Sequence, residues 1–119
     1  MKRGYVRVST VEQNEDRQVE ALTKQGVEVW YTEKVSGKNM ERPELQRLLS
    51  EVQAGDIVFI HDFSRLARST KDLLNIIELL LAKDVHLVSN KENIDTSTPS
   101  GKLMVTVIGA INEFERTNI

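Results

Sequence analysis

Strand and helix signals alternate along this chain of 119 residues, and this alternation restricts the possible folds more than any other feature. Short apolar or alternating runs predict strands at Lys2–Ser9, Val27–Thr32, Ile57–Ile60 and Val85–Val88. The third of these runs is apolar throughout, which is typical of a parallel strand that is buried on both faces.

Helical patterns fill the intervals between these strands. A polar helix is predicted at Glu12–Gln25, with Gly26 as its stop, and a second helix begins at Pro43 and runs to Val52. The segment Ser69-Thr70-Lys71-Asp72 resembles a capping box and opens a third helix. Thr98 as N-cap and Pro99 as first residue suit the start of the last helix.

The alternation predicts an α/β fold with three layers. We expect a doubly wound, mostly parallel sheet of four or five strands with helices on both faces, ending in a long dimerisation helix. Residues 1–99 are expected to form the α/β domain, and residues 100–119 to begin the oligomerisation helix. The last residues read as helix without a stop signal, so we expect a fragment of a longer protein.

Composition excludes several classes of function. The chain has no cysteine, which removes disulfides, thiol catalysis and cysteine-based zinc sites. No run reaches membrane-spanning length and no signal peptide is recognisable, so we expect a cytoplasmic protein without a membrane partner. The formal net charge of −2 gives no general sign of nucleic-acid binding, so a DNA role would depend on local clusters or a separate domain.

The first candidate site is the end of the first strand. Alternation along a strand places Tyr5, Arg7 and Ser9 on one face and Val6 and Val8 on the other. A guanidinium beside a hydroxyl suits a serine that attacks or binds a phosphate. An ordinary amphipathic strand with a polar outer face explains the same pattern.

A second cluster follows the third strand. Arg65 and Arg68 are spaced i, i+3, so one helical turn would put them on the same side, just before the helix that begins near Ser69. In parallel sheets sites form at the carboxyl ends of strands, where Ser9 also lies. Three guanidinium groups could therefore converge on one phosphate, with surface salt bridges as the alternative.

Other chemistries lack the residues they require. There is no G-x-S-x-G for a serine hydrolase, and His61 and His86 lie in or beside predicted strands, where packing or a surface position explains them. No Walker A or dinucleotide fingerprint is present. Asp56 and Asp62 lack a spaced acidic set for a metal, so we expect no metal. We also expect no cofactor and no small-molecule substrate.

The last helix carries apolar residues on more than one side, at positions 103–105, 107, 108, 110, 111 and 114. A helix outside a small sheet needs only one apolar stripe. We expect a partner subunit to cover Met104, Val105, Ile108 and Ile111, and a helix sunk in the core is the alternative.

Five segments of the chain resemble segments of the catalytic domain of the serine recombinases, the resolvase/invertase family. They follow one another along the chain in the same order as in that family. The first strand matches the family pattern Y-x-R-V-S-[ST] and Ser64–Arg68 matches D-R-L-x-R. Thr32–Gly37 matches the acidic-K-x-S-G segment and Glu41–Leu45 the R-P-x-L segment. Residues 101–116 are similar to the start of the family's long dimerisation helix.

The resemblance implies a site-specific DNA recombinase of a bacterium, phage or mobile element, with roles for individual residues. Ser9 would attack the scissile DNA phosphate, forming a 5′-phosphoserine bond and releasing a 3′-hydroxyl. Strand exchange inside a tetramer built from homodimers, and religation without ATP, would follow. The implied catalytic residues are Ser9, Arg7, Arg65, Arg68, Arg42, Ser64, Gln13 and Gln18, with Glu33 at an acidic position nearby. The implied contacts to double-stranded DNA are Tyr5, Arg7, Arg42, Arg65 and Arg68.

Two departures from the family pattern stand out. The residue before Arg65 is Ser64, where family members carry an Asp that is a candidate acid for the leaving 3′-oxygen. The family's DNA-binding domain follows the long helix and lies beyond these 119 residues. The sequence offers no obvious base for the Ser9 proton. Two further readings remain: a non-enzymatic domain that binds a phosphorylated partner through its arginines, and an oligomerisation domain with a decayed site.

Overall fold

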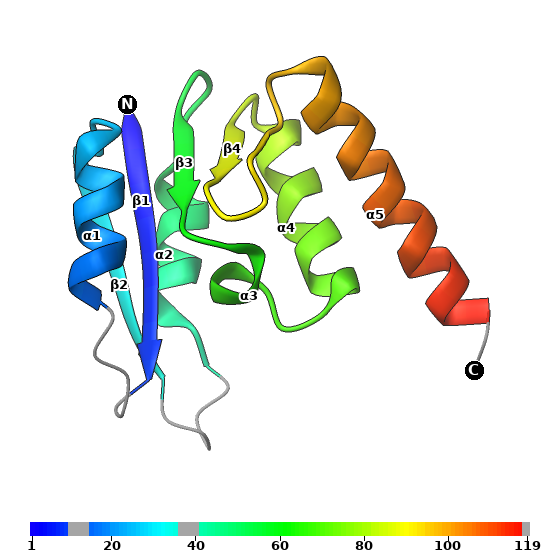
Figure 1. Cartoon of the computed structure of the whole chain (residues 1–119), viewed down its shortest axis with the longest axis horizontal. Helices are drawn as coiled ribbons and strands as arrows, with labels where there is room; N and C mark the ends of the chain where they lie inside the picture. Colours follow the sequence, from blue (N-terminus) through cyan, green and yellow to red (C-terminus); the bar gives the residue numbers. More distant parts are fainter. Residues whose placement is uncertain (10–14, 36–40, 118–119) are drawn as a thin grey trace.

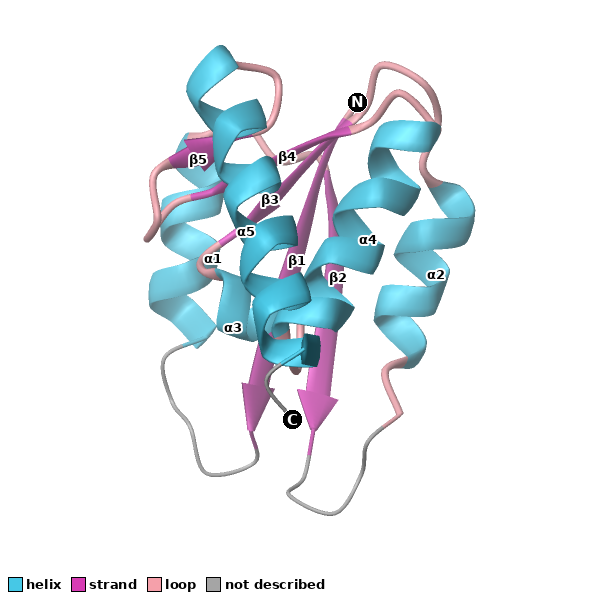
Figure 2. Cartoon of the chain, turned by 90° about the vertical axis from the view of Figure 1, so that its right-hand side faces the viewer, coloured by secondary structure: helices cyan, strands magenta, loops and turns pink. Residues whose placement is uncertain are grey.

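The computed structural model describes residues 1–9, 15–35 and 41–117. A sheet in the order β2-β1-β3-β4-β5 forms its centre (Figures 1 and 2). The first four strands are parallel, and β5 is antiparallel to β4. Their bounds are Lys2–Ser9 for β1, Val29–Val35 for β2, Ile57–Ile60 for β3, His86–Ser89 for β4 and Ile94–Asp95 for β5.

Helices cover both faces of this sheet, which confirms the predicted three-layer arrangement (Figures 1 and 2). On one face lies α1, whose Leu22 packs with Val6, Val8 and Phe59. On the other face lie α2 and α4, which share a larger core with Tyr5 and other residues of the strands. The helix bounds are Glu15–Lys24 for α1, Pro43–Glu51 for α2, Phe63–Leu66 for α3, Thr70–Ala82 for α4 and Pro99–Thr117 for α5.

The alternation expected along the first strand is confirmed. Tyr5 belongs to the core on the α2 and α4 side, whereas Val6 and Val8 belong to the core under α1. In the sheet, Tyr5 pairs with Tyr31 on one side and with Ile60 on the other. Because β1 has a partner strand on each side and Tyr5 is buried, the alternative of an ordinary amphipathic strand with a polar outer face does not hold.

Local signals at the helix ends agree with the structure. The Ser69 side chain accepts a hydrogen bond from the Asp72 amide at 3.1 Å and caps α4. The Thr98 hydroxyl accepts from the Gly101 amide at 3.0 Å at the start of α5. Gly26, just after α1, has φ +90°, a left-handed conformation that suits glycine at a helix stop.

Two short elements and several boundaries differ from prediction. The polar segment expected as a loop at residues 89–97 contains β5, which adds a fifth strand. A single helical turn, α3, follows β3 where the spacing of Arg65 and Arg68 suggested one, but it ends at Leu66, before Arg68. The second strand lies at Val29–Val35 rather than Val27–Thr32, and the predicted start of the first helix at Glu12 lies outside the described residues.

The last helix packs against α4 and β5. Gly101 makes this approach possible, because a Cβ there would lie 1.8 Å from the carbonyl oxygen of Asp95. Ile108 is buried in the main core and Val105 packs against that core. The expectation that a partner covers Ile108 is therefore wrong, since the same chain already covers it.

The outer side of α5 is nevertheless apolar. Leu103, Val107, Ile111 and Phe114 are exposed at heptad-like spacing, with Leu103 at 63% and Phe114 at 65% of full exposure. Met104 is also exposed, and with Ile111 it borders an apolar groove of about 510 Å³ between α5 and the rest of the molecule. Within the described part of the chain, no helix is both long enough and apolar enough to cross a membrane.

Candidate active site

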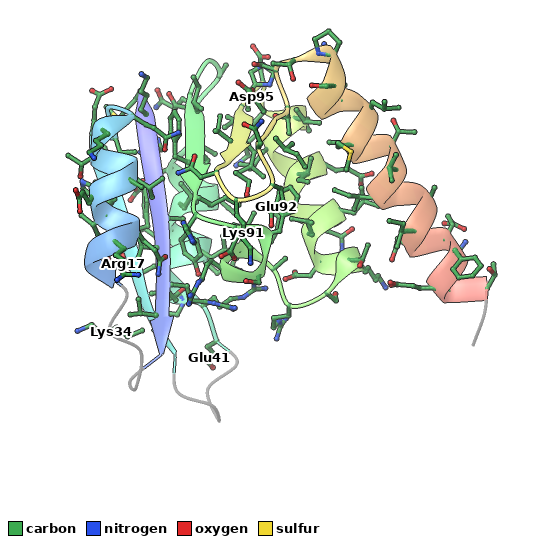
Figure 3. The ribbon with its side chains drawn as sticks, in the orientation of Figure 1. Arg17, Lys34, Glu41, Lys91, Glu92 and Asp95 are labelled. Atoms are coloured by element: carbon green, nitrogen blue, oxygen red, sulfur yellow. The ribbon has the colours of Figure 1, made fainter. Side chains whose placement is uncertain are left out.

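The candidate site is organised around α3, the single turn that follows β3. Asp62 precedes this turn and its side chain accepts a hydrogen bond from the Arg65 amide at 3.0 Å, which caps the turn. The Glu92 carboxylate, labelled near α3 in Figure 3, accepts from the Phe63 amide. These two carboxylates hold the first amides of α3.

The turn ends sooner than the arginine spacing predicts. Ala67 has φ −129° and ψ 153°, so the chain is extended there, and Arg68 lies in the connection between α3 and α4. The expectation that one helical turn carries both Arg65 and Arg68 is therefore wrong. The backbone turns between them, and their positions relative to each other depend on contacts with other elements.

Arg7 and Arg65 interlock at the end of β1. The Arg7 guanidinium donates through Nη2 to the carbonyl of Ser64 at 2.5 Å, and Arg65 donates through Nη1 to the carbonyl of Arg7 at 3.2 Å. A guanidinium has five N–H donors, so the contact to Ser64 occupies only part of the hydrogen-bonding capacity of Arg7. The fold thus brings together two cations that lie far apart in the sequence.

Arg42 reaches the same turn from the start of α2. Its Nη1 donates to the carbonyl of Leu66 at 2.7 Å, and its Nη2 lies 2.9 Å from the Asp72 carboxylate in α4. The side chain is only 8% exposed. Arg42 therefore has an evident structural role in joining α2, α3 and α4, in addition to any role toward a phosphate.

Arg68 differs from the other three arginines. Its backbone amide donates to Asp72 at 3.0 Å, and within the described part of the chain its guanidinium has no hydrogen-bond or ion-pair partner. Arg68 borders a pocket of about 330 Å³ that Glu41, Arg42, Pro43 and Gln46 also line. A cation of this kind, exposed beside Arg42, is available to an anion from outside.

The other four predicted catalytic residues are Ser9, Gln13, Gln18 and Ser64, and the structure describes three of them. Ser9 is the last residue of β1, two positions after Arg7, and its backbone pairs with Val35. Gln13 lies outside the described residues. Gln18 lies in α1 and is 2% exposed, and neither polar atom of its amide has a hydrogen-bond partner among the described residues. Ser64 is exposed, and its hydroxyl donates to Asp62.

Tyr5 requires a correction. It is fully buried, and its hydroxyl donates to the Glu33 carboxylate at 3.3 Å. Burial raises the pKa of Tyr5 well above its usual value, and the neighbouring Glu33 charge adds to this effect. Because the side chain has no exposed surface, the expected contact of Tyr5 with DNA is wrong.

Glu33 is also structural. Its carboxylate accepts hydrogen bonds from the backbone amides of Glu44 and Leu45, the first of them at 3.1 Å. These amides belong to the first turn of α2, where backbone N–H groups have no acceptor inside the helix. The acidic residue of the family segment therefore supports the helix that begins just after Arg42.

In the part of the chain that the structure describes, the acidic residues do not gather into a metal centre. Asp56 lies at the opposite end of β3, where it accepts from Arg3 Nε at 2.8 Å and from the Gln53 amide at 2.9 Å. Burial alone would raise the pKa of Asp56, but these donors hold it below its usual value. Across residues 1–9, 15–35 and 41–117, no group of three His, Cys, Asp or Glu side chains could hold a metal ion.

Sequence reasoning missed two kinds of residue at this site. Asp62 and Asp72 organise the arginines, and nothing in their spacing distinguishes them from ordinary helix-capping residues. Arg17 and Lys34 are exposed, and Figure 3 places them at the end of the molecule where β1 and β2 end. They add positive charge beside the last residue of β1.

Comparison with known proteins agrees with this arrangement. The family model described as the N-terminal domain of resolvase matches residues 3–119. The transposon Tn21 resolvase of Escherichia coli is 40% identical over 119 residues, which are 98% of this chain and 62% of that protein. The DNA-invertase of Escherichia phage P1 is 42% identical over 113 residues, 95% of this chain and 61% of that protein. The chain thus spans less than two thirds of these relatives.

Solved structures give the same result. The N-terminal catalytic domain of TP901-1 integrase matches with a TM-score of 0.81 and 35% identity, covering 98% of this chain and 96% of that one. A resolvase-family site-specific recombinase from Streptococcus pneumoniae matches with a TM-score of 0.76 and 25% identity, covering 98% of this chain and 88% of the other. The chain belongs to the resolvase family and corresponds to its N-terminal domain.

Proposed function

We propose that this chain is the catalytic domain of a serine site-specific DNA recombinase. Ser9 attacks the scissile phosphate of double-stranded DNA, so that a bond between Ser9 Oγ and phosphorus forms while the bond to the 3′-oxygen breaks. The products are a 5′-phosphoserine linkage and a free 3′-hydroxyl. Because the covalent bond conserves the energy of the phosphodiester, religation after strand exchange needs no cofactor.

The observation that carries this proposal is the gathering of arginines from three elements around α3. Arg7 comes from β1, Arg42 from the start of α2 and Arg65 from α3, and Arg68 lies directly after that turn. A transferring phosphoryl group carries charge on its equatorial oxygens, which guanidinium groups stabilise. Surface salt bridges alone do not explain an arginine whose charge is left without a partner in the described structure, as at Arg68.

We assign different duties to the four arginines. Arg68 and Arg7 contact the phosphate most directly, since Arg68 has no described partner and Arg7 has donors to spare. Arg65 holds the end of β1 through the Arg7 carbonyl while facing the same site. Arg42 fixes the geometry through Leu66 and Asp72 and contributes charge from a buried position.

We further propose that the protein works as a homodimer that assembles into a tetramer on DNA. The exposed apolar residues of α5, Leu103, Val107, Ile111 and Phe114, would form the contact, joined by Met104 at the edge of the groove. Target recognition is assigned to a DNA-binding segment outside these residues, with residues 1–99 as the catalytic part. We expect the protein to act in the cytoplasm of a bacterium, and the relatives from transposons and a phage support a mobile element as its source.

The test is capture of a protein–DNA adduct. The full-length protein is incubated with a supercoiled plasmid that carries the DNA flanking its own gene, and covalent complexes are separated on a denaturing gel. Wild type should form the adduct and Ser9→Ala should not, with an unchanged thermal melt. An adduct that persists in Ser9→Ala would remove Ser9 from the role of nucleophile. Binding without any adduct in wild type would favour a phosphate-binding module.

A further inference from the structure

A buried carboxylate lies next to the position where the family pattern has Asp and this chain has Ser64. Asp62 is 6% exposed, and its Oδ1 accepts from the Arg65 amide at 3.0 Å and from the Ser64 hydroxyl at 2.5 Å. Its Oδ2 lies 3.8 Å from Arg65 Nε and 3.8 Å from His61 Nε2. Hydrogen-bond donors therefore contact Oδ1, whereas the two cationic or titratable groups near Oδ2 lie beyond hydrogen-bond distance.

This arrangement fixes the direction in which the Ser64 hydroxyl points its proton. Since an ionised carboxylate only accepts, the hydroxyl hydrogen lies between Ser64 Oγ and Asp62. The lone pairs of Oγ therefore remain for a second donor, and Ser64 is exposed where that donor could approach. An exposed hydroxyl backed by a buried carboxylate is arranged to accept a proton.

The location fits the nucleophile. The Ser64 carbonyl accepts from Arg7 Nη2, and Arg65 donates to the Arg7 carbonyl, so α3 is fastened to β1 at Arg7. Ser9 follows Arg7 by two residues, a distance of about 7 Å along a strand. The relay pair thus lies beside the strand end that carries the proposed nucleophile.

We propose that Ser64 and Asp62 form the proton relay that activates Ser9, an inference that rests on the proposed function. As the bond from Ser9 Oγ to phosphorus forms, the Ser9 proton passes to Ser64 Oγ and the Ser64 proton passes to Asp62 Oδ1. The bond from phosphorus to the 3′-oxygen breaks, and that oxygen takes a proton from solvent. In religation the 3′-hydroxyl attacks and releases its proton to solvent, and Asp62 returns its proton through Ser64 to Ser9.

The other carboxylates near α3 have different duties. Asp72 pairs with Arg42 and accepts from the Arg68 amide, and Glu92 accepts from Phe63 and Ser89. Glu33 caps α2. The charged or titratable groups that face Asp62 and Ser64 are Arg7 from β1, Arg65 from α3, His61 after β3 and Glu92 from the β4–β5 connection.

The first experiment measures the rate of adduct formation by the full-length protein on the flanking-DNA plasmid. Ser64→Ala and Asp62→Asn should each slow it by about 100-fold at neutral pH, the lower range for loss of a general base. Asn can still cap α3, so the fold should survive. The double variant should be no slower than either single one, because the two residues act as one unit.

Matched variants separate the relay from a structural effect. Ser64→Thr keeps the hydroxyl and Ser64→Asp supplies a carboxylate directly, so both should stay within about tenfold of wild type. Ser69→Ala makes the same change five residues away, at the α4 cap, and should lower the melting temperature without slowing adduct formation to the same extent. If Ser64→Thr and Ser64→Asp are as slow as Ser64→Ala, the relay is wrong.

Two further measurements identify which proton is moved. The rate of Ser64→Ala should rise about tenfold per pH unit, because hydroxide must replace the relay, while the wild-type rate changes much less.

A synthetic site with sulfur in place of the bridging 3′-oxygen has a leaving group that needs no proton. The Ser64→Ala defect should persist on it, and its disappearance would assign the relay to the leaving group and overturn the proposal. If the wild type forms the adduct and both Ser64→Ala and Asp62→Asn are fully active, the relay is refuted but the proposed function stands. If the wild type forms no adduct, the proposed function itself is refuted.

Discussion

The guanidinium of Arg42 and the carboxylate of Asp72 form an ion pair, 2.9 Å from Nη2 to Oδ2, that joins the start of α2 to the first turn of α4. The Arg42 side chain is almost buried, and it also holds the Leu66 carbonyl at the end of α3. One arginine of the candidate site is therefore part of the framework that positions the others.

Removing Asp72 should destabilise the domain. Asp72→Ala leaves the Arg42 charge buried without its partner and removes the acceptor of the Arg68 amide, so we expect a loss of about 3 kcal/mol in the free energy of unfolding. Urea denaturation measures it. The control is Glu113→Ala, which breaks the exposed pair with Arg116 and should change stability by less than about 0.5 kcal/mol. Equal effects of the two variants would contradict a framework role for Arg42.

Substitution of Arg68 should lower activity alone, whereas substitution of Arg42 should lower both activity and stability. Arg68→Lys should slow adduct formation by about 100-fold without changing the melting temperature, because the guanidinium has no described partner and lysine cannot contact a phosphate in bidentate fashion. Arg7→Lys and Arg65→Lys should lose about as much activity, and the losses should not add. Arg42→Lys should lose both activity and stability. Near-wild-type rates in two of these variants would mean that the arginines are structural.

The contact between α5 and β5 should be intolerant of a single methyl group. A Cβ at Gly101 would overlap the Asp95 carbonyl, so Gly101→Ala should cost about 3 kcal/mol of stability. Gly109 lies in the same helix, and a Cβ there would meet nothing closer than 3.9 Å. Gly109→Ala should therefore raise stability by about 0.5–1 kcal/mol, the usual gain of alanine over glycine in a helix. A thermal melt of the two variants side by side checks both signs.

The outer and inner faces of α5 should respond differently to charge. Phe114→Asp should weaken self-association and leave the melting temperature unchanged, because Phe114 is exposed. Ile108→Asp should instead unfold the domain, because Ile108 lies in the main core. Sedimentation velocity over a concentration series reads the first effect and a thermal melt the second. Unchanged association of Phe114→Asp would argue against the outer face as the contact.

Acid should weaken the fold through Asp56. The pKa of Asp56 is lower in the folded protein than its ordinary value of 3.8, so the unfolded chain binds more protons as pH falls through that region. The stabilisation from its contacts is complete above about pH 5 and is lost progressively below that value. Asp56→Asn should be less stable than wild type at neutral pH but show a shallower decline in acid. Parallel declines would show that other carboxylates dominate.

Sequence reasoning succeeded where the signal is local. Ser69, Thr98 and Gly26 act at helix ends as predicted, because capping depends on a few neighbouring residues. The predicted alternation of Tyr5 with Val6 and Val8 is confirmed, because side chains along an extended strand point to opposite faces. The order of strands and helices was enough to predict a mostly parallel sheet with helices on both faces.

The failures depend on contacts between distant segments. A spacing of three between Arg65 and Arg68 implies one helical face only if the helix continues, and α3 ends at Leu66. The sequence pattern suggested that Tyr5 contacts DNA. In the structure Tyr5 is buried, because β1 lies between β2 and β3, and its hydroxyl donates to Glu33. Ile108 and Phe114 are both apolar, and only the packing of α5 on α4 decides which one is covered.

The central claim is that Ser9 becomes covalently joined to a DNA 5′-phosphate. The most direct measurement is to trap the adduct formed by the full-length protein, digest protein and DNA, and locate the nucleotide-bearing peptide by mass spectrometry. We predict a single phosphoserine at residue 9 attached to the 5′ end of the cleaved strand, with a free 3′-hydroxyl on the other end. A linkage at another residue, or to a 3′-phosphate, would contradict the account.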